Sequence, residues 1–272
     1  MSFSKIDSVA LAQCQRELGS RLPVFCVEST GSTNSDVAAM LASGKVQGDF
    51  ALVANTQSAG RGRIPGRRWE SLPGNIFLSC GFSPRGIPPA RLANLTLWLG
   101  VSVATMLREK FAVPVLVKWP NDIWCNGRKM AGMLTEAHVG SGGVRGIIFG
   151  IGLNVNLDAE ALPQTAELRA TSLKAERGEV LDIHRVCAEL LFAIENAYAD
   201  FLAGTHAEKL ALLWKESDYL YGQRIVAVYG NERIEGIACG IDTGGNLQIR
   251  TDAGELRAFS AGDISLGSAS RP

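Results

Sequence analysis

A short segment at residues 60–69, GRGRIPGRRW, concentrates positive charge in one loop. Four of its ten residues are arginines and three are glycines. Glycines allow a backbone to approach a ligand closely, and their N–H groups can face an anion. The planar guanidinium of arginine donates hydrogen bonds in a fork that suits phosphate oxygens and carboxylates. The composition therefore favours a small ligand that bears phosphate, while a solvated surface loop and an RNA-contacting patch remain open alternatives.

The loop matches neither of two common glycine motifs that bind phosphate. The chain contains no GxxxxGK[ST] sequence, which excludes a Walker A loop. The dinucleotide fingerprint GxGxxG also fails, because Pro65 stands where the third glycine is required. Two motifs typical of hydrolytic enzymes, GxSxG and HExxH, are absent as well. A group transfer that relies on positioning and electrostatic stabilisation, without an enzyme nucleophile, fits this pattern.

A second polar segment, VKWPNDIWCNGRKMAGML at residues 117–134, combines charge with two tryptophans around a hairpin. Lys118 and Asp122 flank a Trp-Pro pair, and the proline removes a backbone donor, so the strand is interrupted at the charged residues. This combination indicates a pocket wall. Lys129 begins the return strand, where Gly132 leaves room for a flat ligand. A polar hairpin tip beside core tryptophans is the alternative.

Two further segments carry polar groups that could contact a ligand. STGSTN at residues 29–34 offers hydroxyls and an amide for a polar ligand head, or a helix N-cap alone. GIGLNVN at residues 150–156 ends a strand with Asn154 and Asn156 on the same side. These two asparagines indicate either a ligand contact or a strand end rich in turn formers.

The overall composition limits the classes of function. The 272 residues are 46% apolar and 20% charged, which is ordinary for a soluble globular protein. Lys+Arg and Asp+Glu both number 27, so the net charge is zero. A dedicated nucleic-acid binder normally carries a basic excess, so the arginine loop indicates a small anionic ligand rather than a polymer.

The cysteines and the absence of targeting signals predict a cytoplasmic protein. The N-terminus lacks the basic region and long apolar run of a signal peptide. No stretch of about 18 apolar residues occurs, so we expect no membrane span. No pair of cysteines forms CxxC and no histidine stands at metal-ligand spacing from one, so we expect reduced thiols at Cys14, Cys26, Cys80, Cys125, Cys187 and Cys239.

Apolar periodicity in the first half of the chain predicts alternating helices and strands. The segment from STN onward reads as a helix in which Thr33 is the N-cap, Asp36 occupies a capping-box-like position and Gly44 ends the helix. The other predicted elements are a helix at 5–18, strands at 22–28, 50–56 and 76–82, and a long helix at 90–111.

The second half reads as an antiparallel meander, two helices and a small β unit. Asn126-Gly127 is a strong hairpin signal, because both residues tolerate positive φ. The predicted class is α+β with a mostly antiparallel sheet, divided into a domain of residues 1–220 and a small β-barrel of residues 221–272. The predicted strands before the barrel lie at 115–119, 122–125, 129–139 and 144–156, and the helices at 182–204 and 207–217.

Six motifs, in their order and spacing, together resemble one family, the biotin protein ligases (biotin–acetyl-CoA-carboxylase ligases). The resemblance extends from about residue 22 to the C-terminus. It implies a class II synthetase-like, lipoate-ligase-like catalytic domain followed by an SH3-like β-barrel. The motifs are STN at 32–34, Gln57, GRGRIPGRRW at 60–69, KWPND at 118–122, GRKMAG at 127–132 and GIGLN at 150–154.

The resemblance implies a two-step reaction with biotin and ATP as substrates. The biotin carboxylate attacks the α-phosphate of ATP and gives biotinyl-5′-AMP and pyrophosphate, while Mg²⁺ neutralises phosphate charge. A lysine amine then attacks the mixed anhydride. The expected partner is the biotin carboxyl carrier protein or domain of acetyl-CoA carboxylase, and the expected protein is a monomer or a homodimer.

The same resemblance implies roles for individual residues. The expected catalytic residues are Lys129, Arg61 and Arg63, with Lys129 at the junction of carboxylate and phosphate. The expected biotin-binding residues are Ser32, Thr33, Asn34 and Gln57 at the ureido end, Gly132 under the ring, and Gly60, Arg61, Arg63 and Lys129. The expected ATP- and adenylate-binding residues are Arg63, Arg67, Trp69 beside the adenine, Asn121, Asp122, Lys129 and Asn154, and Asp122 is also the expected Mg²⁺ ligand.

The chain departs from the family pattern in two places. Ile64 and Pro65 stand between GRGR and GR, where the family has one residue, so we expect altered ordering of the loop with the activity retained. About twenty residues precede the catalytic region, too few for the N-terminal winged helix of some members, so we expect no DNA binding. A lipoate ligase or octanoyltransferase and a non-catalytic biotin-binding protein are the alternatives.

Overall fold

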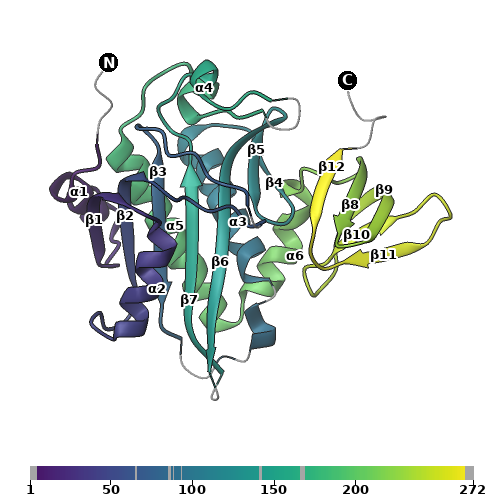
Figure 1. The fold of residues 1–272 in the computed structure, drawn as a ribbon, viewed down its shortest axis with the longest axis horizontal. Helices are drawn as coiled ribbons and strands as arrows, with labels where there is room; N and C mark the ends of the chain where they lie inside the picture. The colour runs from purple at the N-terminus through teal and green to yellow at the C-terminus, as the bar shows by residue number, and fades with distance from the viewer. Residues whose placement is uncertain are drawn as a thin grey trace.

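Seven strands form the main sheet of the computed structural model, in the order β1-β2-β3-β7-β6-β5-β4 (Figure 1). The structure describes residues 5–64, 66–84, 87, 89–92, 94–140, 143–165 and 169–266. β1 and β2 are parallel and the other neighbouring pairs are antiparallel, which confirms the predicted meander. The strands are β1 (Val24–Thr30), β2 (Phe50–Gln57), β3 (Ile76–Phe82), β4 (Val115–Lys118), β5 (Asp122–Cys125), β6 (Arg128–Gly140) and β7 (Gly143–Leu153).

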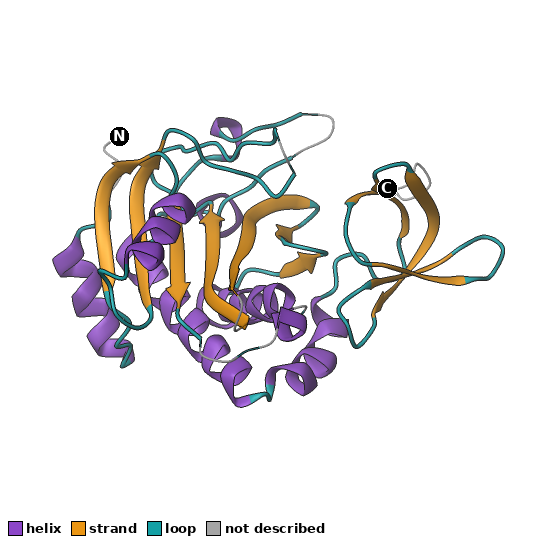
Figure 2. Ribbon diagram, turned by 60° about the horizontal axis from the view of Figure 1, so that its bottom comes forward, coloured by secondary structure: helices purple, strands orange, loops and turns teal. Residues whose placement is uncertain are grey.

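Helices cover both faces of this sheet (Figure 2). On one face lie α1 (Ser8–Leu18), α3 (Leu95–Phe111) and α5 (Ile183–Ala203), where α1 and α3 both pack against α5, with α6 (His206–Ser217) beside α3. On the other face, α2 (Thr33–Ser43) packs against β2, β3 and β7. The short helix α4 is Leu173–Arg177, and 3-10 turns occupy Pro89–Leu92 and Ala159–Ala161.

The position of β3 inside the sheet explains why its sequence is an apolar run. All seven of its residues are buried, because helices cover the sheet on both sides. Side chains alternate between the two faces. Ser79 therefore faces α2, where it bonds to Thr33 and Asn34, whereas Phe82 stacks on Tyr198 of α5.

The predicted start of α2 is wrong in its detail. Ser32 is the N-cap residue and Thr33 is the first helical residue. The backbone N–H of Thr33 donates to Gln57 Oε1 at 2.8 Å, and the Thr33 hydroxyl oxygen lies 3.1 Å from the same atom, so β2 supplies the acceptor that a cap side chain would otherwise supply. Asp36 accepts a hydrogen bond from the Thr30 hydroxyl instead of closing a capping box.

Two other local predictions have different outcomes. The long helix α3 begins at Leu95 rather than at residue 90, because a 3-10 turn precedes it. The hairpin between β5 and β6 is confirmed, since Asn126 and Gly127 have φ values of 49° and 74°. These values lie in the left-handed region, which favours asparagine and glycine.

The C-terminal strands form a five-stranded antiparallel sheet in the order β11-β10-β9-β8-β12, an SH3-like β-barrel. It joins the main body through hydrogen bonds from Trp119 Nε1 to the Gly245 carbonyl (3.0 Å) and from Asn94 Nδ2 to the Thr243 carbonyl (2.9 Å). The strands are β8 (Arg224–Tyr229), β9 (Glu232–Ile241), β10 (Leu247–Arg250), β11 (Leu256–Phe259) and β12 (Asp263–Leu266). Within the described ranges, no helix is long and apolar enough to cross a membrane.

The burial of core side chains predicts how substitutions change the free energy of unfolding. Phe149 of β7 is fully buried, so Phe149→Ala should lower the free energy of unfolding by about 3–5 kcal/mol through lost contacts and a cavity. Urea denaturation followed by circular dichroism measures this change. Val139, near the end of β6, is 59% exposed, and Val139→Ala should change stability by less than about 0.5 kcal/mol. Equal effects of the two substitutions would contradict the described packing.

Candidate functional site

One cavity gathers most of the residues that the sequence singled out. It lies where the start of α2, the arginine loop and strands β6 and β7 meet, and its volume is about 70 Å³. The lining residues that were predicted are Ser32, Thr33, Asn34, Gln57, Arg61, Arg63, Trp69, Asn121, Lys129 and Gly132. The others are Gly62, Met133, Leu134, Gly150, Ile151 and Gly152.

One end of the cavity is a chain of neutral polar side chains. Ser79 Oγ lies 2.7 Å from Thr33 Oγ1 and 2.6 Å from Asn34 Oδ1. Thr33, Asn34 and Ser79 are each at most 5% exposed, so their hydrogen bonds fix their positions. Such a group can bind a ligand head that both donates and accepts hydrogen bonds.

The floor of the cavity is bare backbone. Gly132 and Gly152 stand opposite each other on β6 and β7, and the indole of Trp69 lies on them. A Cβ added at Gly152 would lie 2.6 Å from Trp69 Nε1, and one at Gly132 would lie 2.8 Å from Trp69 Cζ3. The buried Trp69 Nε1 has no hydrogen-bond partner among the described residues, so it offers a donor to an acceptor in the cavity.

Lys129 supplies positive charge beside this floor. Its Nζ lies 2.7 Å from Asp122 Oδ1, with both side chains 20% exposed, and 5.5 Å from the centroid of the Trp69 ring. Asp122 lies outside the cavity lining and orients the ammonium group. Lys118 is a second lysine nearby, 4.4 Å from the Trp124 ring, and burial lowers its pKa despite the opposing charges of Asp122 and Asp263.

The arginine loop folds as a small hairpin over the cavity. Gly62 N–H donates to the Arg67 carbonyl (2.9 Å) and Trp69 N–H to the Gly60 carbonyl (3.1 Å). Gly60 has this structural role and does not line the cavity, since a Cβ there would lie 2.7 Å from the Trp69 carbonyl oxygen. Ile64 lies at the hairpin tip, where its carbonyl accepts from the Arg67 N–H at 3.1 Å, and Pro65 lies outside the described residues.

The loop arginines bind groups from distant parts of the chain. Arg61 pairs with Glu136 of β6 at 3.1 Å. Arg63 donates to Asn121 Oδ1 (3.3 Å) and to the carbonyl of Gly262 in the barrel. Burial lowers the pKa of the Arg63 guanidinium, and the charges of Asp122 and Asp263 oppose this shift.

Arg67 connects the loop to the barrel rather than to the cavity. Its guanidinium forms two contacts with the Asp263 carboxylate at 2.6 and 3.4 Å. Both side chains are about half exposed, so this pair holds the loop only weakly. The predicted contact of Arg67 with a nucleotide therefore requires this pair to open.

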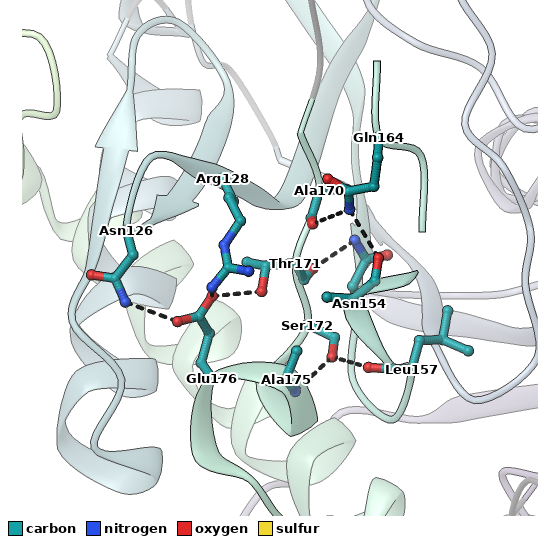
Figure 3. A network of polar contacts seen from close by, with 11 residues as sticks. Asn126, Arg128, Asn154, Leu157, Gln164, Ala170, Thr171, Ser172, Ala175 and Glu176 are labelled. Carbon is teal, nitrogen blue, oxygen red and sulfur yellow. Dashed lines mark hydrogen bonds and ion pairs between the residues drawn. The ribbon is translucent and has the colours of Figure 1, made fainter. Parts of the chain in front are cut away.

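Asn154 does not line the cavity, and its side chain takes part in a network of polar contacts instead (Figure 3). It is 4% exposed, accepts from Asn75 Nδ2 at 3.0 Å and donates to the Thr171 carbonyl at 3.0 Å. Its neighbour Asn156 donates to the Leu181 carbonyl at 2.8 Å. Both side chains therefore hold loops behind the site.

The sequence reasoning missed several residues of the site. A Cβ at Gly150 would lie 2.8 Å from Asn34 Cγ, so the polar end needs this glycine. Gly150 and Gly152 alternate in GIGLN and so share a face of β7, a signal that could have indicated a bare floor. Ser79 is the single polar residue of the apolar strand β3, and Glu136 is one of several polar residues on β6, so only their three-dimensional contacts distinguish them.

The acidic residues do not form a metal cage. Among the described residues, no cluster of three or more His, Cys, Asp or Glu side chains could hold a metal ion. Asp122, the predicted Mg²⁺ ligand, is bound to Lys129. A single carboxylate is compatible with Mg²⁺, which proteins often hold with one or two carboxylates plus substrate phosphates.

Comparison with known proteins agrees with this geometry. Residues 26–154 match the model of the Biotin/lipoate A/B protein ligase family, and residues 220–267 match the Biotin protein ligase C terminal domain. The solved biotin protein ligase from Aquifex aeolicus in complex with biotin and ATP superposes with a TM-score of 0.75 and 28% identity, covering 90% of this chain and 98% of that one.

Curated relatives indicate more narrowly which class of ligase this chain resembles. The Bifunctional ligase/repressor BirA of Bacillus subtilis is 36% identical over 87% of this chain and 72% of its own length. The Biotin–[acetyl-CoA-carboxylase] ligases of Mycobacterium tuberculosis and Paracoccus denitrificans are 33% and 32% identical, covering 86% and 98% of their own lengths and 88% of this chain. The fold and the site thus define a member of the biotin/lipoate ligase class. More narrowly, the chain belongs to the biotin protein ligases.

The glycine floor can be tested without a ligand. Gly152→Ala should push the Trp69 indole off the sheet and lower the free energy of unfolding by about 1–3 kcal/mol, as overpacking does. Acrylamide quenching of tryptophan fluorescence should increase, because the other four tryptophans are buried and only Trp69 is partly exposed. Gly31→Ala is the control, since its added Cβ has nothing within 4 Å. Unchanged quenching in Gly152→Ala would contradict the placement of Trp69.

Proposed function

We propose that this chain joins biotin to ATP as biotinyl-5′-AMP and then transfers biotin to a lysine of a biotin carboxyl carrier protein or domain. The observation that carries this proposal is the order of groups along one cavity: a neutral polar end, a bare glycine floor and a cationic end. Biotin has the same order, with a urea, a fused ring and a carboxylate. The relative from Aquifex aeolicus, solved with biotin and ATP, supports the assignment.

The polar end suits the urea of biotin. A urea presents one carbonyl acceptor and two N–H donors, and hydroxyl and amide groups can satisfy both kinds. Ser32, Thr33, Asn34 and Gln57 provide them here. The fused ring would then lie toward Gly132 and Trp69, where the floor has no room for a side chain on the strand.

The cationic end suits the reaction. In the first step, a biotin carboxylate oxygen forms a bond to the α-phosphorus of ATP while the bond from that phosphorus to the pyrophosphate oxygen breaks. Negative charge grows on the phosphoryl oxygens, so fixed donors there stabilise the transition state. Lys129, oriented by Asp122, and Arg63 are the groups placed to supply this charge.

In the second step, the lysine amine of the carrier attacks the acyl carbon of the mixed anhydride. The bond from that carbon to the phosphate oxygen breaks, AMP leaves, and the amine loses a proton as the amide forms. Lys129 can stabilise the departing phosphate oxygen in the same position that served the first step. No enzyme nucleophile is required.

Mg²⁺ fits this site as a partner of the nucleotide rather than of a protein cage. It would supply charge neutralisation of the phosphates. Asp122 is the carboxylate next to Lys129, and its second oxygen could contribute to holding the ion. We also place the reaction in the cytoplasm, in keeping with six free cysteines.

Ligand entry requires movement of the loop. The cavity volume of about 70 Å³ is well below the roughly 300 Å³ at which pockets for ligands of drug size begin. Trp69 and the loop hairpin occupy the remaining space above the floor. We therefore expect the loop to lift when biotin and ATP bind and to close over the adenylate.

The function is tested with labelled biotin, MgATP and a purified biotin carboxyl carrier domain, with label on the carrier as the readout. The wild-type protein should transfer biotin only with ATP, and a parallel reaction with lipoate should give none. Lys129→Ala should lower kcat by about 100-fold or more, because it removes a donor to the transition state. Transfer of lipoate alone would overturn the proposal.

Lys209→Ala provides the matched control for that substitution. Lys209 also pairs with an aspartate, Asp200, at 2.6 Å, but it lies on α6 outside the site. Its removal should leave transfer unchanged. Equal losses in the two variants would mean that Lys129 acts through stability and not through the reaction.

A further inference from the structure

Glu136 places a carboxylate beside a site for anionic substrates, and no motif named above includes it. Its Oε2 atom accepts a hydrogen bond from Asn34 Nδ2 at 2.7 Å and pairs with Arg61 at 3.1 Å. It therefore contacts both the polar end of the cavity and the loop above it. A negative charge in this position is unexpected, because it opposes the binding of carboxylate and phosphate groups.

Glu136 is the nearer of two acceptors that determine which way the Asn34 amide is turned. An ionised carboxylate can only accept hydrogen bonds, so the Asn34 atom that faces it must be the amide nitrogen. The same nitrogen donates to the Leu134 carbonyl at 3.3 Å. The amide oxygen of Asn34 is thereby directed at the hydroxyl of Ser79.

This orientation fixes the next two hydrogen bonds in turn. Ser79 has one hydroxyl proton and must give it to Asn34 Oδ1, 2.6 Å away. The 2.7 Å contact between Ser79 and Thr33 then needs the single hydroxyl proton of Thr33, which points to Ser79 rather than to Gln57 Oε1 at 3.1 Å. Every proton in the chain Thr33, Ser79, Asn34 consequently points toward Glu136, and Thr33 keeps a free lone pair.

We propose that Glu136 is a positioning residue that sets the hydrogen-bonding direction of the polar end of the cavity. Through Asn34 and Ser79 it turns Thr33 into an acceptor, which a ligand N–H of the urea type requires. The inference rests on the proposed function, because the urea belongs to biotin. The Arg61 pair contributes less, since Arg61 and Glu136 are 48% and 35% exposed in their side chains.

The experiment compares two ligands on three variants by isothermal titration calorimetry. Glu136→Gln removes the charge at nearly constant shape and allows Asn34 to turn over, so biotin should bind about tenfold more weakly. Biotinamide has the ring and urea without the carboxylate, and it should lose affinity by the same factor. Glu136→Asp keeps an acceptor-only group and should retain more affinity than Glu136→Gln.

Glu235→Gln is the matched control. Glu235 lies on β9 of the barrel, pairs with Arg233 and is 45% exposed in its side chain. It is therefore a glutamate paired with an arginine, like Glu136, but it lies outside the cavity. This variant should bind both ligands like the wild-type protein. Thermal unfolding of every variant shows whether a loss of binding reflects a loss of folding.

A ligand-free readout makes the test independent of affinity. The side-chain amide signals of Asn34 in a ¹H–¹⁵N spectrum, identified through Asn34→Ala, should shift in Glu136→Gln and not in Glu235→Gln. A purely structural role of Glu136 would change stability without a selective shift of these two amide protons.

The outcomes separate the inference from the proposed function. Wild-type protein that fails to bind biotin overturns the proposed function. Wild-type binding with unchanged affinity and unchanged Asn34 signals in Glu136→Gln overturns the inference alone. Weakened binding of biotin with normal binding of biotinamide also overturns it, because Glu136 would then act through Arg61 and the carboxylate.

Discussion

The site depends on a bare patch of backbone at the centre of a crowded sheet. Gly132 and Gly152 face each other across β6 and β7, so two adjacent strands lack side chains at the same level. The indole of Trp69 lies directly on this patch. A Cβ at either glycine would displace the Trp69 indole. It would also disturb the loop hairpin, which the hydrogen bond from the Trp69 N–H to the Gly60 carbonyl closes. The flat floor thus sets where the loop rests and where a flat ligand ring can lie.

The positive charge of the loop is balanced by acceptors from elsewhere in the chain. Arg61 has Glu136, Arg63 has a side-chain and a backbone carbonyl, and Arg67 has Asp263. These contacts allow cations to gather in a partly buried space, because each of the three guanidinium groups has an acceptor. Because the pairs are largely exposed, an anionic substrate can replace them at small energetic cost. The arginines of the site are therefore held in place by contacts that a substrate can replace.

The barrel takes part in this arrangement because the loop reaches it directly. Gly262 accepts from Arg63, and Asp263 pairs with Arg67, at the start of β12. The apolar core also runs without a break from the main sheet into the barrel. The predicted boundary at residue 220 lies between the last helix of the main body and the first strand of the second sheet, and the arginine loop makes contacts on both sides of that position.

Much of the fold followed from local chemistry in the sequence. The bounds of β3 and β5 and the Asn126-Gly127 hairpin were predicted correctly, because turns and apolar runs depend on neighbouring residues. The motifs likewise indicated most of the residues that line the cavity. Local patterns also misled, since Thr33 looked like a helix cap until β2 brought Gln57 within hydrogen-bonding distance.

The sequence by itself therefore determined the elements, the family and the inventory of polar groups. Tertiary structure alone decided which group each of them binds. Asn154 looked equal to Asn34 as a ligand residue, but packing buried it against Asn75 and Thr171. Glu136 carried no sequence signal, and it became the acceptor for two parts of the site. The physical reason is distance along the chain: Asn34 and Glu136 are 102 residues apart, and no local pattern encodes a hydrogen bond of that span.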